Sequence, residues 1–485
     1  MTIQRSMRAS RLNPLAGALA LAIAASTPSV AMSFAPNQRL DAPAARAGVD
    51  ATDRPRPRFA HADAVFARLE RPDGGPPIVV TSCDDAGPGT LREAYFNAVD
   101  GDVIDLTQLT CSEISLTTGA LTNSPSAAEV SLEGAGKYAL TINGNNNGRV
   151  LVHNGTGTLT VYGLTISGGS YSGPYGGGCI YSYGNVLLEA ANVSSCSLSS
   201  SGTDHAYGGA IYAKKGVLLA GAAITDSSAH AASANSAGGA LWAYNSYIYL
   251  STVSGNTVSG DGSHYSRGGG VFARGNAKIH YATFADNSAE SGGAIFLFGG
   301  ATDTMVIANS TISGNHASGA GGGLFAKYRP LEIDNSTITG NTAVFDFGAG
   351  AYLYTDTDIE STIVAGNTSQ DGLQASDVGG NASITITGAN NLIVAATLPV
   401  PADTISADPM LGPLQNNGGI TMTHALLPGS PAIGHGNNVR NFAYDQRFSD
   451  AATPFGYERV VGANADIGAF EFGAPDRIFM SDFDF

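Results

Sequence analysis

Residues 284–287 read Phe284-Ala285-Asp286-Asn287, and residues 292–296 read Gly292-Gly293-Ala294-Ile295-Phe296. The second motif, a small pair rich in glycine followed by an apolar and an aromatic residue, recurs seven times. Its aromatic positions are Tyr181, Tyr212, Trp242, Phe272, Phe296, Phe325 and Tyr352, with spacings of 31, 30, 30, 24, 29 and 27 residues. Such a period is typical of a solenoid, in which each repeat packs only on its neighbours.

The first motif recurs about halfway between the glycine pairs. Its last residue is an asparagine in five repeats, at Asn256, Asn287, Asn315, Asn341 and Asn367. Cys196 and Ser227 hold this position in the first two repeats. Asparagine and glycine tolerate the left-handed backbone conformation that a sharp corner requires. Stacked repeats would align these asparagines, so we expect a ladder of side-chain hydrogen bonds along the axis.

The runs between these corners are rich in Thr, Ile, Val and Tyr, which favour extended backbone. Helical periodicity is absent between residues 140 and 400. A β-propeller blade needs about 40 or more residues, so these repeats are too short for that fold. We therefore predict an all-β protein, a single-stranded right-handed parallel β-helix over residues 126–398 with a cap at each end.

One strand of each repeat has a readable register. The residues beside the aromatic position are aliphatic or small, whereas the fifth residue from the glycine is often charged. The fifth positions are Tyr183, Lys214, Tyr244, Arg274, Phe298, Lys327 and, in the last repeat, Thr355 or its neighbour Tyr354.

Side chains alternate between the two faces of a strand, so the third and fifth positions share one face. Lys and Arg are rarely buried without a partner, which favours the outer face. A bend before the fifth residue would instead place the aromatic residues inside, as a stacked core. If the aromatic residues lie on the outer face, the ligand-binding candidates are Tyr212, Trp242, Phe272, Lys214, Arg274 and Lys327.

The composition excludes several classes of protein. Glycine provides 63 of 485 residues, and charged residues make up 13 %, about half their usual share. Lysine occurs only five times, which argues against coiled coils and long charged helices. The net charge of −16 disfavours nucleic acid as a partner, and also acidic polymers unless a metal or a local basic stripe intervenes.

The N-terminus resembles an export signal over residues 1–31. Arg5, Arg8 and Arg11 precede a short apolar run, Leu15 to Ala25, and Ser29-Val30-Ala31 offers a cleavage site. No other run is long enough to span a membrane. Export permits disulfides, and we expect the local pairs Cys83–Cys111 and Cys179–Cys196 among three possible connectivities.

The segments outside the repeats divide into a linker, two caps and a tail. Residues 32–75 are rich in Pro, Arg and Ala and predict a disordered linker. Residues 76–125 would form an N-terminal cap, with a short amphipathic helix from Leu91 to Ala98. Residues 399–472 would close the other end, which otherwise exposes an open rung, and residues 473–485 form a tail.

Three motifs resemble those of known surface proteins. The Phe284–Asn287 and Gly292–Ile295 pair is similar to polymorphic outer membrane protein repeats, which implies a pectin-lyase-like β-helix at the cell surface. Leu91-Arg92-Glu93-Ala94 resembles a motif that opens such bacterial proteins. The segments 412–419, 424–433, 445–447 and 466–471 are similar to a choice-of-anchor C-terminal domain, with extra residues 448–458 as a departure. These resemblances carry over no catalytic residue.

The tail Arg477 to Phe485 resembles short Ile-Phe tails on secreted proteins of some Gram-negative bacteria. Together these features favour an exported protein, secreted or associated with the outer membrane. Its expected partner is an extracellular glycan or a host or neighbouring-cell surface, bound without catalysis. We expect no cofactor and no metal.

The alternative is a polysaccharide lyase or glycoside hydrolase. Such an enzyme needs clustered carboxylates, and a lyase also needs Ca²⁺ and a basic side chain. The candidates are Asp356, Asp358 and Glu332, near Lys327 and Arg329. Four histidines in the loops before glycine pairs have no tight metal-binding spacing; they are His205, His230, His264 and His316.

Overall fold

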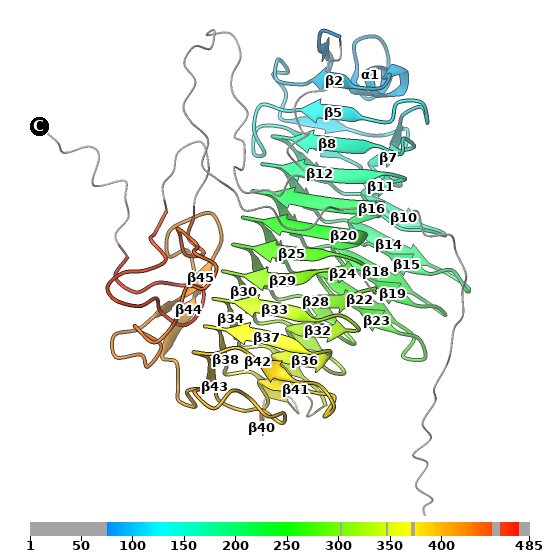
Figure 1. Cartoon of the computed structure of the whole chain (residues 1–485). Helices are drawn as coiled ribbons and strands as arrows, with labels where there is room; N and C mark the ends of the chain where they lie inside the picture. The colour runs from blue at the N-terminus through cyan, green and yellow to red at the C-terminus, as the bar shows by residue number, and fades with distance from the viewer. Residues whose placement is uncertain (1–74, 301–302, 346–347, 370–373, 449–455, 475–485) are drawn as a thin grey trace, which may run out of the picture. The chain divides into compact units, whose positions relative to one another are not determined.

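The computed structural model describes residues 75–300, 303–345, 348–369, 374–448 and 456–474. Strands make up 43 % of the chain and helices 2 %, and the strands form a parallel β-solenoid of about 11 turns. Figure 1 shows the strands stacked one over another, from β2 (Asp102–Asp105) to β41 (Val378–Gly380). The predicted fold class is therefore confirmed.

The largest sheet, called sheet 1 here, contains twenty strands in two ranks that share β16 and β20. The first rank contains β4 (Leu121–Thr122), β7 (Leu151–His153), β11 (Ile180–Ser182), β16 (Ile211–Ala220), β20 (Leu241–Tyr249), β24 (Val271–Ala273), β28 (Ile295–Phe298), β32 (Leu324–Lys327), β36 (Ala351–Tyr354) and β41. The second rank adds β1 (Ile78–Val79), β2, β5 (Val130–Glu133), β8 (Thr158–Tyr162), β12 (Asn185–Glu189), β25 (Ala277–His280), β29 (Met305–Ala308), β33 (Leu331–Asp334), β37 (Thr357–Glu360) and β42 (Ile386–Thr387).

Two further long sheets complete the coils. Sheet 2 contains β3 (Glu113–Ser115), β6 (Thr141–Asn143), β9 (Thr165–Ser167), β13 (Asn192–Ser194), β17 (Ala223–Thr225), β21 (Thr252–Ser254), β26 (Thr283–Ala285), β30 (Thr311–Ser313), β34 (Thr337–Thr339), β38 (Ile363–Ala365) and β43 (Leu392–Ile393). Sheet 3 contains β10 (Ser170–Ser172), β14 (Ser197–Ser200), β18 (Ser228–Ala231), β22 (Thr257–Gly260), β27 (Ser288–Ala289), β31 (His316–Ala317), β35 (Thr342–Ala343), β39 (Thr368–Ser369) and β40 (Gln374–Ala375).

Three short strands form a small sheet beside the first rank: β15 (Ala206–Tyr207), β19 (Ser236–Ala237) and β23 (Ser266–Arg267). Among the described strands, pairing is parallel except between β39 and β40 and between β44 (Leu411–Gln415) and β45 (Thr423–Leu426).

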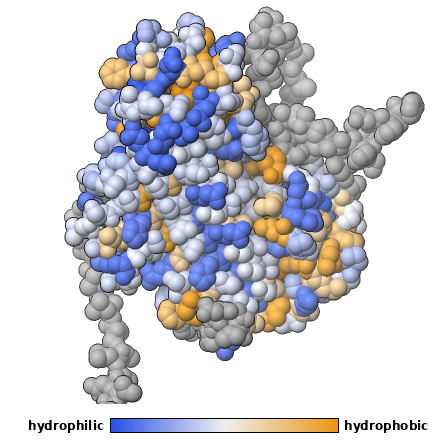
Figure 2. All heavy atoms as spheres, turned by 180° about the vertical axis from the view of Figure 1, so that it is seen from behind, coloured by the Kyte–Doolittle hydropathy of each residue, from blue (hydrophilic) through white to orange (hydrophobic). Residues whose placement is uncertain are grey.

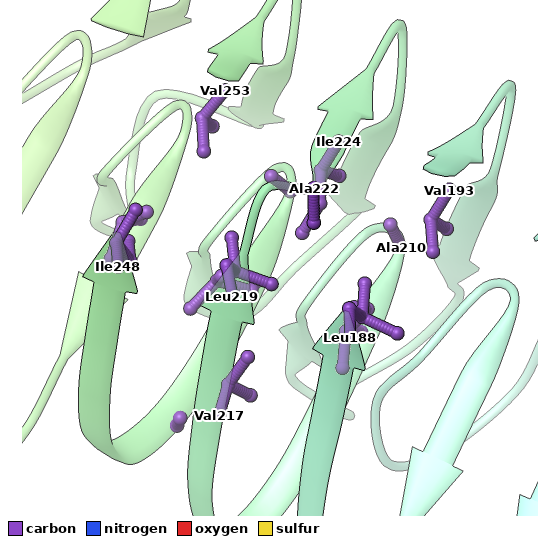
Figure 3. Packing of buried hydrophobic residues seen from close by; sticks show 14 of the residues in the cluster. Leu188, Val193, Ala210, Val217, Leu219, Ala222, Ile224, Ile248 and Val253 are labelled. Carbon is purple, nitrogen blue, oxygen red and sulfur yellow. The ribbon is translucent and has the colours of Figure 1, made fainter. Parts of the chain in front are cut away.

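The interior of the coil is apolar because alternate side chains of each strand point inward. Leu188, Leu219 and Ile248 are in register on β12, β16 and β20. Figure 3 shows them beside side chains from sheet 2, whose column is Val193, Ile224 and Val253. All six are fully buried, and burial of each such side chain contributes about 1.5–3 kcal/mol to stability.

Two different constraints explain the repeated glycine pairs. Gly292 adopts φ of +64°, a conformation that costs a residue with a side chain about 1–2 kcal/mol. Gly293 has no room for a Cβ, which would collide with the carbonyl oxygen of Gly322 in the next coil. The first glycine therefore serves the turn and the second serves close stacking.

The asparagine ladder is present as predicted. The Nδ2 of each asparagine donates to the Oδ1 of the next, from Asn256 to Asn287 and Asn315 at 2.9 Å each. The ladder continues through Asn341 to Asn367, whose Nδ2 donates to Oδ1 of Asp377 at 2.9 Å. All of these side chains are buried, so the ladder satisfies polar groups that water cannot reach.

A second ladder of hydroxyl groups, which the sequence analysis did not identify, lies before sheet 2. The backbone N–H of Ser310 donates to Ser336 Oγ, and the N–H of Ser336 donates to Thr362 Oγ1, both at 3.2 Å. The N–H of Thr362 then donates to Asn391 Oδ1 at 3.0 Å. The residue types vary along this ladder, so it leaves no single motif in the sequence.

The N-terminal end is closed by a helix, as predicted. Helix α1 (Leu91–Asn97) begins after Thr90, whose side chain accepts a hydrogen bond from the N–H of Glu93. Leu91 and Tyr95 are fully buried against the coil core. Both expected disulfides, Cys83–Cys111 and Cys179–Cys196, are formed.

We expected residues 399–472 to close the C-terminal end of the coil, but this segment packs along the flank of sheet 2. Its first residues extend sheet 2 by a bridge between Leu392 and Ile405. The segment then returns along the outer face, where Gln446 Nε2 donates to Thr283 Oγ1 and Oε1 accepts from Thr311 Oγ1. Buried ion pairs hold it together, Arg447 with Asp445 and Arg459 with Glu471.

Several expectations lie outside the described residues. They are the export signal over 1–31, the linker over 32–74, most of the extra stretch 448–458 and most of the tail. Within the described ranges, no helix is long and apolar enough to cross a membrane.

We predict that Asn315→Ala lowers the free energy of unfolding by about 2–3 kcal/mol, because it leaves buried donors of the ladder without acceptors. Exposed Asn97 provides the control, and Asn97→Ala should change stability by less than about 0.5 kcal/mol. Denaturant unfolding measures both variants. Equal, small effects would show that the ladder does not stabilise the coil.

Candidate ligand-binding face

The aromatic residues of the repeats lie on the outer face of sheet 1. On β20, Leu241 and Ala243 belong to the coil core, whereas Trp242 between them belongs to a separate cluster. The same alternation holds on β16, where Ile211 and Ala213 point inward and Tyr212 packs outside. The aromatic residues therefore lie on the outer face that alternation and the charged fifth positions favoured, and not in a stacked core inside the coil.

These aromatic rings form a continuous stack along the axis. The ring centroids of Tyr181 and Tyr212 are 5.3 Å apart, and those of Tyr212 and Trp242 are 4.8 Å apart. The stack continues from Trp242 through Phe272, Phe296 and Phe325, with ring planes within 12° of parallel. Because the strands of neighbouring rungs are in register, their aromatic rings lie face to face.

The stack is outside the coil but largely covered, which corrects the expectation of a freely exposed stripe. Trp242 and Phe272 each retain only 9 % of their exposure. Tyr207, from the small sheet, stacks on Trp242 at 5.6 Å, and Ala237 of the same sheet joins the cluster. The strands that precede Gly208 and Gly238, β15 and β19, thus cover this part of the column.

The fifth positions form the part of this face that water reaches. Aromatic and cationic side chains alternate there from one rung to the next: Tyr183, Lys214, Tyr244, Arg274, Phe298, Lys327 and Tyr354. Tyr354, not Thr355, holds the last position, because it pairs with Lys327 while Thr355 is buried. Tyr183, Tyr244 and Tyr354 are all exposed. We call these seven residues the alternating column.

The cations of the alternating column lie against neighbouring rings. Lys214 Nζ is 4.0 Å from the ring centroid of Tyr183, and Lys327 Nζ is 5.1 Å from that of Tyr354. Within the described part of the chain, Lys214, Arg274 and Lys327 form no ion pair. Their positive charges therefore remain available to a partner.

Two further cations, half-buried, lie on the aromatic residues. The guanidinium of Arg149 is 3.5 Å from the ring centroid of Tyr171, and that of Arg267 is 5.0 Å from that of Phe296. Burial raises the pKa of the hydroxyl groups of Tyr207 and Tyr212. A phenol hydroxyl that is protonated at neutral pH can donate a hydrogen bond.

The structure brings only part of the proposed catalytic set together. Glu332 and Asp358 are in register on β33 and β37, as are Asp334 and Glu360. Asp356 instead accepts a hydrogen bond from the N–H of Thr385 at 2.8 Å.

The remaining carboxylates have structural partners. Arg440 of the C-terminal segment pairs with both Glu332 and Asp334, a contact that the sequence analysis missed. Asp358 accepts from Thr387 Oγ1, and Glu360 accepts from the N–H of Ala389. Arg329 donates to the carbonyl oxygen of Asp303 rather than to this group. Glu332 and Asp334 thus attach the C-terminal segment, whereas Asp358 and Glu360 bond to the next coil.

The four loop histidines do not assemble into a site. His205 stacks on Tyr207, and His264 contacts Asp261. His230 contacts Ser259, and His316 contacts Thr342. In the part of the chain that the structure describes, no group of three or more His, Cys, Asp or Glu residues is placed to hold a metal ion.

Comparison with protein-family models, with curated proteins and with solved structures gave no match to the chain.

We predict that Trp242→Ala lowers the free energy of unfolding by about 3–4 kcal/mol although the ring lies outside the coil, because it is stacked and nearly buried. Tyr244→Ala, at a ring that is 45 % exposed, should cost less than about 1 kcal/mol. Denaturant unfolding of the two variants separates structural from accessible rings. A cost for Trp242→Ala as small as for Tyr244→Ala would refute the stacked column.

A second prediction concerns pH. Burial raises the pKa of Asp334 to about 6, against the attraction of Arg440 and with repulsion from Glu332 and Asp358. The folded protein then binds this proton more tightly than the unfolded chain does, so Asp334 should reduce stability as pH rises from about 4 to about 6. Asp334→Asn should remove this part of the pH dependence, and Asp204→Asn, at an exposed site, should retain it. An unchanged pH profile in Asp334→Asn would contradict the assignment.

Proposed function

We propose that this chain is an exported bacterial protein, secreted or held at the cell surface, that binds extracellular glycans without catalysis. The observation that carries the proposal is the alternating column, with exposed rings at Tyr183, Tyr244 and Tyr354. Aromatic rings offer apolar faces for the C–H groups of sugars, and the adjacent Lys and Arg donate hydrogen bonds to hydroxyl groups.

The rigidity of the scaffold supports this role. Two of the exposed rings rest edge-on against aromatic residues of the repeats, Tyr183 against Tyr181 at 5.1 Å and Tyr354 against Tyr352 at 5.3 Å. A ligand that binds preorganised side chains does not have to bear the entropy cost of ordering them.

Hydrophilic residues cover most of the face in Figure 2, and hydrophobic residues form scattered patches.

Export is supported by the sequence and by the disulfides. Cys83–Cys111 and Cys179–Cys196 include all four cysteines, and disulfides of this kind persist in oxidising compartments outside the cytosol. The resemblance to polymorphic outer membrane repeats and to a choice-of-anchor segment points to the surface of a Gram-negative cell. We propose this location together with the function.

The enzyme alternative has less support. A lyase or hydrolase needs carboxylates that are free to hold a metal or to act on a bound sugar. Glu332 and Asp334 instead share Arg440, and Asp358 is bonded to Thr387. These contacts occupy the side chains that the sequence offered for catalysis.

Binding to a panel of immobilised polysaccharides tests the function, with parallel assays for new reducing ends and unsaturated uronates with and without Ca²⁺. We expect binding without turnover, weakened about three- to tenfold by Tyr244→Ala. Tyr138→Ala is the matched control, since Tyr138 is 87 % exposed and lies outside the alternating column. Turnover would establish the enzyme alternative. Equal effects of the two variants on binding would show that the glycan binds outside the alternating column.

A further inference from the structure

Resting on the proposed function, we infer that the ligand is an acidic polysaccharide with one negative group on about every second sugar, bound lengthwise along the alternating column. Three features of the column support this inference: the period of its cations, their lack of acidic partners and the rings between them. None of these features requires catalysis.

The first feature is the period. Lys214, Arg274 and Lys327 occupy the second, fourth and sixth rungs of the column, with one ring on each rung between. Stacked rungs are about 4.8 Å apart, so neighbouring cations repeat at about 10 Å. One pyranose in an extended chain spans a length close to one rung. A polymer of alternating neutral and acidic sugars therefore matches rings and cations in turn.

The second feature is the charge. The chain has 40 acidic and 24 basic residues, yet these three cations have no ion-pair partner among the described residues. Lys214 and Lys327 lie over rings, which attract a cation but do not neutralise it. The column is thus a positive line on an acidic protein.

The third feature is the ring on each rung between two cations, which fits the apolar face of a sugar. Nucleic acids also stack on aromatic residues beside cations, so the density of charge has to distinguish the two classes of polymer. A nucleic acid carries a phosphate at every nucleotide, a denser charge than one cation per two rungs can match. The excess phosphates would face a protein of net charge −16. A sparsely charged polymer avoids this repulsion.

Binding of the full secreted chain to defined polymers tests the inference. The probes are three polysaccharides with one carboxylate per disaccharide, namely hyaluronan, unsulfated chondroitin and heparosan, each beside its carboxyl-reduced neutral form. Polygalacturonate, with a carboxylate on every sugar, and oligo(dT) test the spacing of the charge and the class of polymer.

The variants are Lys214→Gln, Arg274→Gln and Lys327→Gln, singly and combined, with Lys137→Gln as the charge-matched control. Lys137 lies outside the column and donates to the carbonyl oxygen of Gly221. Gln keeps the length of the side chain, and circular dichroism verifies the fold of each variant. Since each exposed charge pair contributes little, we expect binding about tenfold weaker in the triple variant and unchanged in the control.

Binding of at least one of the three probes, lost on carboxyl reduction and weakened in the triple variant, supports the inference. Equal binding of the neutral forms, or no effect of the triple variant, overturns it and leaves the proposed function standing. Tighter binding of polygalacturonate overturns the charge period, and tighter binding of oligo(dT) makes the ligand a nucleic acid. If the protein binds no glycan, neutral or acidic, that result contradicts the proposed function itself.

Discussion

Parallel stacking of one coil on the next, in register, is the constraint on which the rest of this structure depends. Backbone hydrogen bonds fix each rung above its neighbour, so that equivalent sequence positions become columns in space. The inward column forms the core, and the corner column forms the asparagine ladder that ends at Asp377. The outward column forms the aromatic stack and the surface beside it. A single change of register would alter all of these columns together, because neighbouring side chains point to opposite faces.

The sequence predicted what this repetition determines. The glycine pairs recur at positions where the backbone allows few residues, and Asn256 to Asn367 recur where a buried side chain bonds along the axis. The fold and the ladder could therefore be inferred, and alternation favoured the outward direction of Trp242. The coverage of Trp242 could not be inferred from the sequence, because Tyr207 and Ala237 come from segments whose path does not repeat strictly. The hydroxyl ladder was missed for a similar reason: Ser310, Ser336 and Thr362 differ in type while making the same bond.

Contacts between distant parts of the chain were the least predictable. Gln446 and Arg447 looked like motif residues of a cap, yet they are buried along the flank of sheet 2. Arg440 reaches Glu332 and Asp334, more than one hundred residues away, and turns a catalytic candidate into an attachment site. By contrast, the alternating column was visible in the sequence residue by residue. Its order of rings and cations became clear only once the register showed that Tyr354 follows Lys327.

The spacing of the alternating column can be measured directly by electron–electron double resonance, with spin labels at Lys214→Cys and Lys327→Cys, since the native cysteines are paired. The two positions are 113 residues apart in sequence but four rungs apart in the column. The account predicts a narrow distribution centred near 20 Å, from four rungs of about 4.8 Å. A broad distribution, or a mean beyond about 40 Å, twice the stacked distance, would contradict the in-register coil and the ligand-binding face built on it.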